Sequence, residues 1–107
     1  MTTKVSRKLG TSRAGERTRI WLEGRLLTEH GFEAGQKFLR AWRGAALILT
    51  ACDAAAFDAA AHGERGTVSG RREKPIIDLI SAQFPETFSG THIAVTFAAG
   101  RIRVAAD

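Results

Sequence analysis

Cationic side chains are the most numerous groups in this chain that could do chemistry, and they gather in its first part. The chain carries 16 Lys and Arg against 11 Asp and Glu, a net charge of +5. Residues 1–43 hold ten cations and four acids, whereas residues 44–63 hold two acids and no cation. Clustered cations are typical of proteins that bind the phosphates of nucleic acid.

We expect the phosphate contacts to come from cations in the N-terminal segment and around the starts of two similar stretches. These residues are Lys4, Arg7, Lys8, Arg13, Arg17, Arg19, Arg25, Arg71, Arg72 and Lys74. The alternative is that these cations are solvated charges of a terminus and of loops, with no partner.

Two carboxylates, Glu23 and Asp78, occupy equivalent positions in the two similar stretches. As a pair they could hold a divalent metal ion for hydrolysis of nucleic acid. The simpler interpretation, which we favour, is that each accepts hydrogen bonds from the backbone of a short helix that follows it. We therefore expect a protein that is not an enzyme.

No other constellation for catalysis or metal binding is present. His30, His62, His92 and Cys52 lack the spacing of metal ligands, and there is no glycine-rich phosphate loop or nucleophile motif, so we expect no cofactor. A single cysteine excludes an internal disulfide, and we expect Cys52 to be a small buried group. No apolar run precedes Ile20 and none is long enough to span a bilayer, which favours a cytoplasmic protein without a membrane partner.

The chain contains an internal repeat, which sets the elements that must position these residues. Residues 19–51 align without a gap on residues 74–106 at an offset of 55, so that Glu23 falls on Asp78 and Phe38 on Ile93. Each stretch is too small to bury its own apolar face, and the two are expected to share one core.

The first stretch predicts a strand, a short helix and a hairpin. Alternation predicts a strand over 19–23, with Trp21 on the face opposite Ile20 and covered by the helix or the connector. A short helix over 25–30 would end at Gly31, and strands over 36–42 and 47–49 would follow. Arg40 is expected to lie over the Trp42 ring as a cation–π contact.

The second stretch repeats this order with differences. It predicts strands over 75–78, 91–97 and 102–104, and a short helix that Ser81 caps. Alternation turns Arg101 and Arg103 away from the apolar side of their strand.

One compact α+β domain, mainly β, is therefore expected, with short helices and an Ala-rich connector helix. Its parts are a flexible basic arm over 1–18 with a short strand around 4–7, a first unit over 19–51, a connector helix and basic loop over 52–73, and a second unit over 74–107.

The segment RIWLEGRLLTEHGFEAGQKF resembles the SymE toxin family and, more broadly, the AbrB–MazE superfamily of swapped-hairpin regulators. The resemblance implies that two units interleave their hairpins into one pseudo-twofold β-barrel, whose basic face contacts DNA. With two copies in tandem, the chain would be a monomeric pseudo-dimer, or would associate further as a homodimer. Pro75, Pro85 and the missing Gly-Phe pair make the second copy divergent.

These features predict a nucleic-acid-binding protein, with double-stranded DNA preferred over RNA, acting as a regulator or in a toxin or defence system. Two alternatives stay open. One is an RNA-cleaving toxin that uses Glu23 or Asp78. The other is an inhibitor or antitoxin-type module that binds a protein partner through an apolar patch near Trp21 or Phe57.

Overall fold

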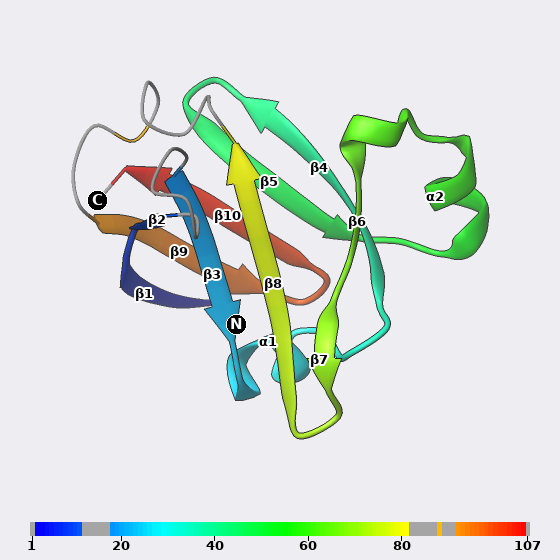
Figure 1. Ribbon diagram of the computed structural model, residues 1–107, viewed down its shortest axis with the longest axis horizontal. Coiled ribbons are helices and arrows are strands. Elements are labelled where there is room, and N and C mark those ends of the chain that lie inside the picture. Colours follow the sequence, from blue (N-terminus) through cyan, green and yellow to red (C-terminus); the bar gives the residue numbers. More distant parts are fainter. Residues whose placement is uncertain (1, 12–17, 82–87, 89–91, 107) are drawn as a thin grey trace.

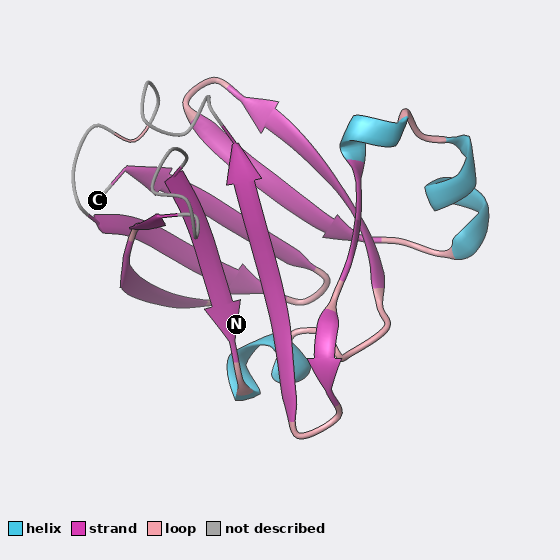
Figure 2. Cartoon of the chain, viewed as in Figure 1, coloured by secondary structure: helices cyan, strands magenta, loops and turns pink. Residues whose placement is uncertain are grey.

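Strands dominate the protein, as the sequence predicts (Figure 2). The computed structural model describes residues 2–11, 18–81, 88 and 92–106. In chain order the elements are β1 (Thr3–Lys8), β2 (Gly10–Thr11), β3 (Thr18–Glu23), α1 (Arg25–Glu29), β4 (Lys37–Arg43), β5 (Ala46–Ala51), α2 (Ala54–Ala59), a 3-10 turn η1 (His62–Glu64), β6 (Arg65–Thr67), β7 (Ser69–Arg71), β8 (Lys74–Ser81), β9 (His92–Ala98) and β10 (Arg101–Ala106).

These strands form two antiparallel sheets. The larger sheet has the order β1-β9-β10-β5-β4-β6, and the smaller has the order β2-β3-β8-β7. Figure 1 shows β3 and β8 crossing in front of the larger sheet, with α2 at the edge formed by β4 and β6. The predicted closed barrel is not found among the described residues, whose strands form two separate hydrogen-bonded sheets.

The hydrophobic core lies between the sheets and draws on both predicted units. Ile20 and Leu22 of β3 and Ile77 of β8 meet Phe38 of β4 and Ile93 of β9 in one buried cluster. Burying a large apolar side chain contributes about 1.5–3 kcal/mol, so neither sheet is stable without the other's apolar face.

Strand pairing follows the offset of 55. That offset carries β4 onto β9 and β5 onto β10, residue for residue. In the smaller sheet Leu22 lies opposite Ile77, and in the larger sheet Ile48 lies opposite Arg103. Both pairs join residues 55 apart. Equivalent strands therefore lie at equal distances from the centre of each sheet, β5 with β10 and β4 with β9 in the larger sheet and β3 with β8 in the smaller.

The outermost strands of the larger sheet come from the predicted arm and the predicted connector region. β1 comes from the N-terminal segment but pairs with β9, whereas β6 follows the connector but pairs with β4. The short strand expected inside the arm is present as β1, where Val5 lies opposite Val95 and packs against the core. One prediction needs correction, because the expected basic loop after the connector contains β6 and β7.

Local signals placed the short helices well. The Phe32 N–H donates to the Leu27 carbonyl oxygen (2.8 Å) and the Gly31 N–H to that of Thr28 (3.3 Å), so α1 ends in a Schellman motif with Gly31 at φ +90°. Asp53 caps α2, since its Oδ1 accepts from the Ala56 N–H at 2.8 Å. Ser81 is the last residue of β8, and the helix predicted after it lies outside the described residues.

Candidate nucleic-acid interface

The larger sheet has one face turned toward the core and one turned away from it, which we call the outer face. Strand alternation separates the two faces: Ile102 and Val104 of β10 are buried, whereas Arg101 and Arg103 between them are exposed. Residues directly opposite one another on antiparallel strands share a face. Lys4 of β1, opposite Thr96, and Arg43 of β4, opposite Ala46, therefore lie on the outer face with Arg103.

The strands of the larger sheet carry cations and no acid. Their Lys and Arg residues are Lys4, Arg7, Lys8, Lys37, Arg40, Arg43, Arg65, Arg101 and Arg103. The acids of the described residues lie instead on β3, β8, the helices and the turns. The larger sheet is therefore a positive surface whose charges no carboxylate of its own strands neutralises.

Three of these cations are held by the connector region. Lys37 Nζ lies 4.4 Å from the centroid of the Phe57 ring, and the Arg65 guanidinium lies 5.2 Å from the same centroid. Arg65 also donates to the carbonyl oxygens of Asp58 and Ala60. Arg40 Nε donates to the carbonyl oxygen of Gly63 at 3.0 Å, so this guanidinium has a partner other than the expected Trp42 ring.

Five further cations are available to a partner. Within the described ranges, no side-chain ion pair or hydrogen bond is made by this set: Lys4, Lys8, Arg43, Arg101 and Arg103. Alternation places all five on the outer face. They stand on β1, β10 and β4, which alternate in the sheet with β9 and β5.

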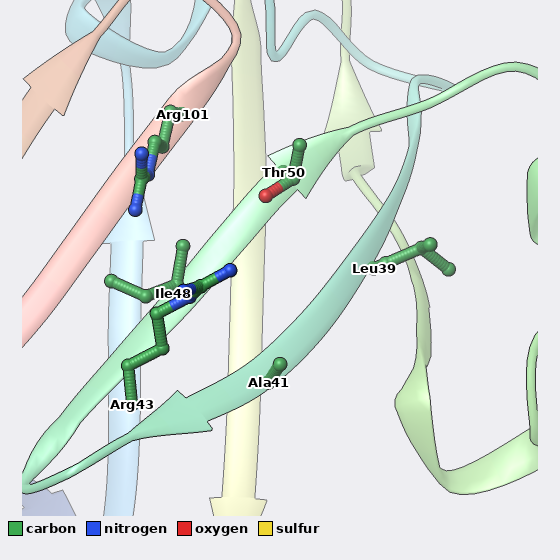
Figure 3. Close-up of a pocket in the computed structure, with 6 residues that line it drawn as sticks. All are labelled: Leu39, Ala41, Arg43, Ile48, Thr50 and Arg101. Carbon is green, nitrogen blue, oxygen red and sulfur yellow. The ribbon is translucent and has the colours of Figure 1, made fainter.

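A pocket of about 360 Å³ opens on this face between β4, β5 and β10. Arg43 and Arg101 lie at its two ends, and the remaining lining residues are Leu39, Ala41, Ile48 and Thr50. Figure 3 shows the Arg43 side chain reaching over Ile48 and the Arg101 side chain lying along β10, with β3 and β8 behind the sheet. The pocket therefore offers two guanidinium groups and a hydroxyl above a floor that is largely apolar.

Three of the predicted phosphate-binding cations are paired with acids. Arg19 Nε lies 2.9 Å from Asp78 Oδ1, and its Nη2 donates to Oδ2 at 3.2 Å. Lys74 Nζ lies 3.6 Å from Glu23 Oε2. Arg25 pairs with Glu29 one helical turn later, at 3.3 Å.

The other predicted cations are divided between the two sheets. Lys4 and Lys8 lie on the outer face and Arg7 lies on the same edge strand, where its Nη1 donates to the carbonyl oxygen of Ser6. Arg71 and Arg72 lie at the β7–β8 turn of the smaller sheet. Arg13 and Arg17 lie outside the described residues. The structure therefore does not bring the predicted set together on one surface.

Glu23 and Asp78 do not act as helix caps, and this correction follows from the strand pairing. Gly24 is the N-cap of α1 and contributes no side-chain hydrogen bond, while Asp78 lies inside β8. Each carboxylate instead pairs with a cation across the β3–β8 ladder. The two ion pairs correspond to one another under the offset of 55, because Arg19 corresponds to Lys74 and Glu23 to Asp78.

Trp21 is exposed, whereas the sequence led us to expect it under the helix or the connector. Trp21 is 39% accessible to solvent, and the Arg19 guanidinium lies 5.2 Å from the centroid of its ring. The ring stands on the face of β3 opposite the buried Ile20 and Leu22. This face of the smaller sheet therefore carries an aromatic ring beside balanced ion pairs.

Sequence reasoning did not select Arg43, Arg101 and Arg103 as binding residues. The signal was available, because Arg101 and Arg103 alternate with Ile102 and Val104 and must face away from the core. What the sequence could not supply was the strand order, which places Arg43 two strands from Arg101 on the same face.

Cys52 is half-buried at the end of β5, where its carbonyl oxygen accepts from Gln36 Nε2 at 2.9 Å. Burial, followed by the nearby Asp53 carboxylate, raises the pKa of its thiol above the ordinary value of 9.0, and Lys37 opposes this shift. A raised pKa leaves the thiol protonated at neutral pH and makes it a poor nucleophile.

Comparison with known proteins gives no further assignment: no protein-family model, no curated protein and no solved structure matches the chain. Among the described residues, no helix has the length and apolar character needed to cross a membrane.

Proposed function

We propose that this protein binds nucleic acid, with duplex DNA as the preferred ligand, through the outer face of the larger sheet. The observation that carries the proposal is the charge of that sheet: its described strands hold nine cations and no acid, and alternation places seven of these cations on the outer face. A surface of one sign releases counterions from a phosphate backbone when it binds, which supplies affinity without base contacts.

The dimensions of the outer face favour the backbone of a duplex. Six strands at about 4.8 Å spacing make a surface about 24 Å wide, too broad for a major groove of about 12 Å. The described strands of the outer face carry no Trp, Tyr or Phe for base stacking, because their residues on this face are Lys, Arg, His, Ser, Thr and aliphatic residues. Such a face suits phosphates better than the unstacked bases of a single strand.

The symmetry of strand pairing supports the same proposal. We infer that the two halves are copies of one swapped-hairpin-type unit, since both sheets pair residues 55 apart at their centres. The approximate two-fold axis then passes between β5 and β10, in the middle of the outer face. A duplex backbone has a two-fold axis of its own at each base pair, so the surface and its ligand have compatible symmetry.

Salt-titrated fluorescence anisotropy with a labelled duplex of about 20 base pairs tests the proposal. If each of the five unpartnered cations meets one phosphate, the slope of log Kobs against log[salt] should be about −4.5. The same protein should bind the corresponding single strand more weakly. Affinity below about 1 mM⁻¹ at low salt for both ligands would remove the proposal.

A second candidate function, binding of a protein partner, is favoured by exposed Trp21 alone. Aromatic rings are enriched at protein interfaces, and the ion pairs beside Trp21 leave its face nearly neutral. Trp21→Ala should then abolish capture of the partner while leaving DNA affinity unchanged. Loss of DNA affinity in this variant would contradict the assignment of DNA to the other sheet.

Nucleolytic cleavage by Glu23 and Asp78 is the third hypothesis. Both carboxylates already have cationic partners on the neighbouring strand, which leaves each less available to a metal ion. If the protein degrades RNA, the double variant E23Q/D78N should retain that activity. Loss of cleavage without loss of folding would instead assign the reaction to these residues.

A further inference from the structure

The pocket between Arg43 and Arg101 is the feature of the outer face with the most defined geometry. β5 runs between β4 and β10, so the two arginines stand on the strands that flank it on opposite sides. Arg43 lies opposite Ala46 at one end of β5, and Arg101 lies opposite Thr50 toward the other. Both side chains line the same pocket (Figure 3).

The pocket is suited to an anion rather than to an apolar ligand. Its two charged side chains have the same sign, and no acid lines it. Neither guanidinium has a hydrogen-bond or ion-pair partner within the described part of the chain. Arginine presents a planar fork of N–H donors that matches phosphate oxygens, and Thr50 adds a hydroxyl donor.

The floor of the pocket explains how a phosphate could approach closely. Ala41 and Ile48 present short or flat side chains between the arginines, and Ile48 is only 6% accessible. A duplex lying on the face could therefore seat one backbone phosphate against β5 while both guanidinium groups close over its oxygens.

We propose that this pocket seats a single phosphate group of a duplex backbone, held jointly by Arg43 and Arg101. The proposal rests on the proposed function and makes it specific, because it separates this seat from the rest of the positive face. Arg103 provides the matched control, since it lies on the same face opposite Ile48 but does not line the pocket.

A double-mutant cycle on the full chain tests the seat, using anisotropy with the 20-base-pair duplex. Arg43→Ala and Arg101→Ala should each weaken binding about tenfold, as expected for loss of a charge-assisted contact. Because both residues hold one phosphate, losing the second arginine should cost little more. The duplex affinity of the double variant should be at most about threefold below that of the single variant with the lower affinity. Each of these three variants should reduce the salt slope by about one.

The control pair behaves differently under the proposal. Arg101→Ala and Arg103→Ala address separate phosphates, so their effects should multiply and their salt slopes should fall by about two. Circular dichroism and thermal unfolding check that each variant is folded. R43Q and R101Q, which keep a polar side chain but remove the charge and the guanidinium fork, replace any alanine variant that is not.

The outcomes separate the seat from the function. If the unaltered protein binds neither duplex nor single strand, the proposed function fails. If it binds but the Arg43 and Arg101 effects multiply, each arginine holds its own phosphate and the shared seat is overturned, while nucleic-acid binding stands. Unchanged affinity in both single variants would overturn the seat in the same way.

Discussion

Asp78 is the residue whose role changes most between sequence and structure. It accepts one hydrogen bond from Arg19 Nη2 and forms an ion pair with that guanidinium, and both side chains are about 30% accessible. Asp78→Asn should therefore lower the free energy of unfolding by about 1 kcal/mol, the upper end for partly exposed pairs. Glu23→Gln should cost about 0.3 kcal/mol, because its pair with Lys74 is longer and more exposed.

Urea denaturation of both variants measures these differences. Equal losses, or a larger loss in Glu23→Gln, would contradict this ranking. Sequence alone identified the two acids as equivalent but assigned them to helix capping. It could not show that β3 and β8 are neighbours, and a cross-strand ion pair exists only once that pairing is known.

Cys52 makes the stability of the folded protein depend on pH in the alkaline range. Burial and Asp53 raise its pKa in the folded state, so the folded protein holds the thiol proton more tightly than the unfolded chain does. The corresponding stability is fully present below about pH 9 and is lost as the pH rises through the folded-state pKa. Alkylation by iodoacetamide should show a midpoint at higher pH in the native protein than in urea.

Cys52→Ser should flatten the alkaline part of the stability profile while leaving stability near pH 7 almost unchanged. A native alkylation midpoint below the one in urea would reverse the sign and contradict the assignment. The sequence showed a lone cysteine beside an acid, but its half-buried place at the end of β5 depends on the folded hairpin.

β6 is a short strand that the sequence did not predict, and it can pair with β4 because residue 66 is a glycine. A Cβ at Gly66 would overlap the ring of Phe38, which lies directly opposite on β4. Gly66→Ala should therefore destabilise the protein by about 1–3 kcal/mol through overpacking. Gly63→Ala is the control, because a Cβ there meets no atom within 4 Å.

Thermal unfolding of these two alanine variants compares them directly. A Gly66→Ala protein as stable as Gly63→Ala would mean that β6 does not pack on Phe38. Alternation and turn residues predicted β3, β4, β5, β9 and β10 well, because each has its own apolar period. β1 and β6 show only weak alternation of apolar and polar residues. They form strands because each pairs with the free edge of a hairpin, β1 with β9 and β6 with β4.

The two halves of the chain are joined at the centres of both sheets, where β5 pairs with β10 and β3 with β8, and also at the edges of the larger sheet. β1 completes the hairpin of the second half, and β6 completes that of the first half. Separate polypeptides covering residues 1–60 and 61–107 should each be unfolded or self-associated on their own. Mixing them should restore a 1:1 complex with the circular dichroism spectrum of the intact chain.

Size-exclusion chromatography with light scattering gives the state of each half. A folded, monomeric half would contradict the joining of the halves across both sheets. The internal offset of 55 was visible in the sequence. In the structure, the central strand pairs of both sheets include residues that are 55 apart. The boundaries of the halves were not visible, because β1 and β6 lie in segments that looked like an arm and a loop.

The central claim is that nucleic acid binds the outer face of the larger sheet and not the ion-paired smaller sheet. Paired charge reversals measured by salt-titrated anisotropy test it most directly: Lys4→Glu with Arg103→Glu on one sheet, and Arg71→Glu with Arg72→Glu on the other. We predict a loss of duplex affinity of at least about 100-fold for the first pair and less than about threefold for the second. The opposite ranking would contradict the account.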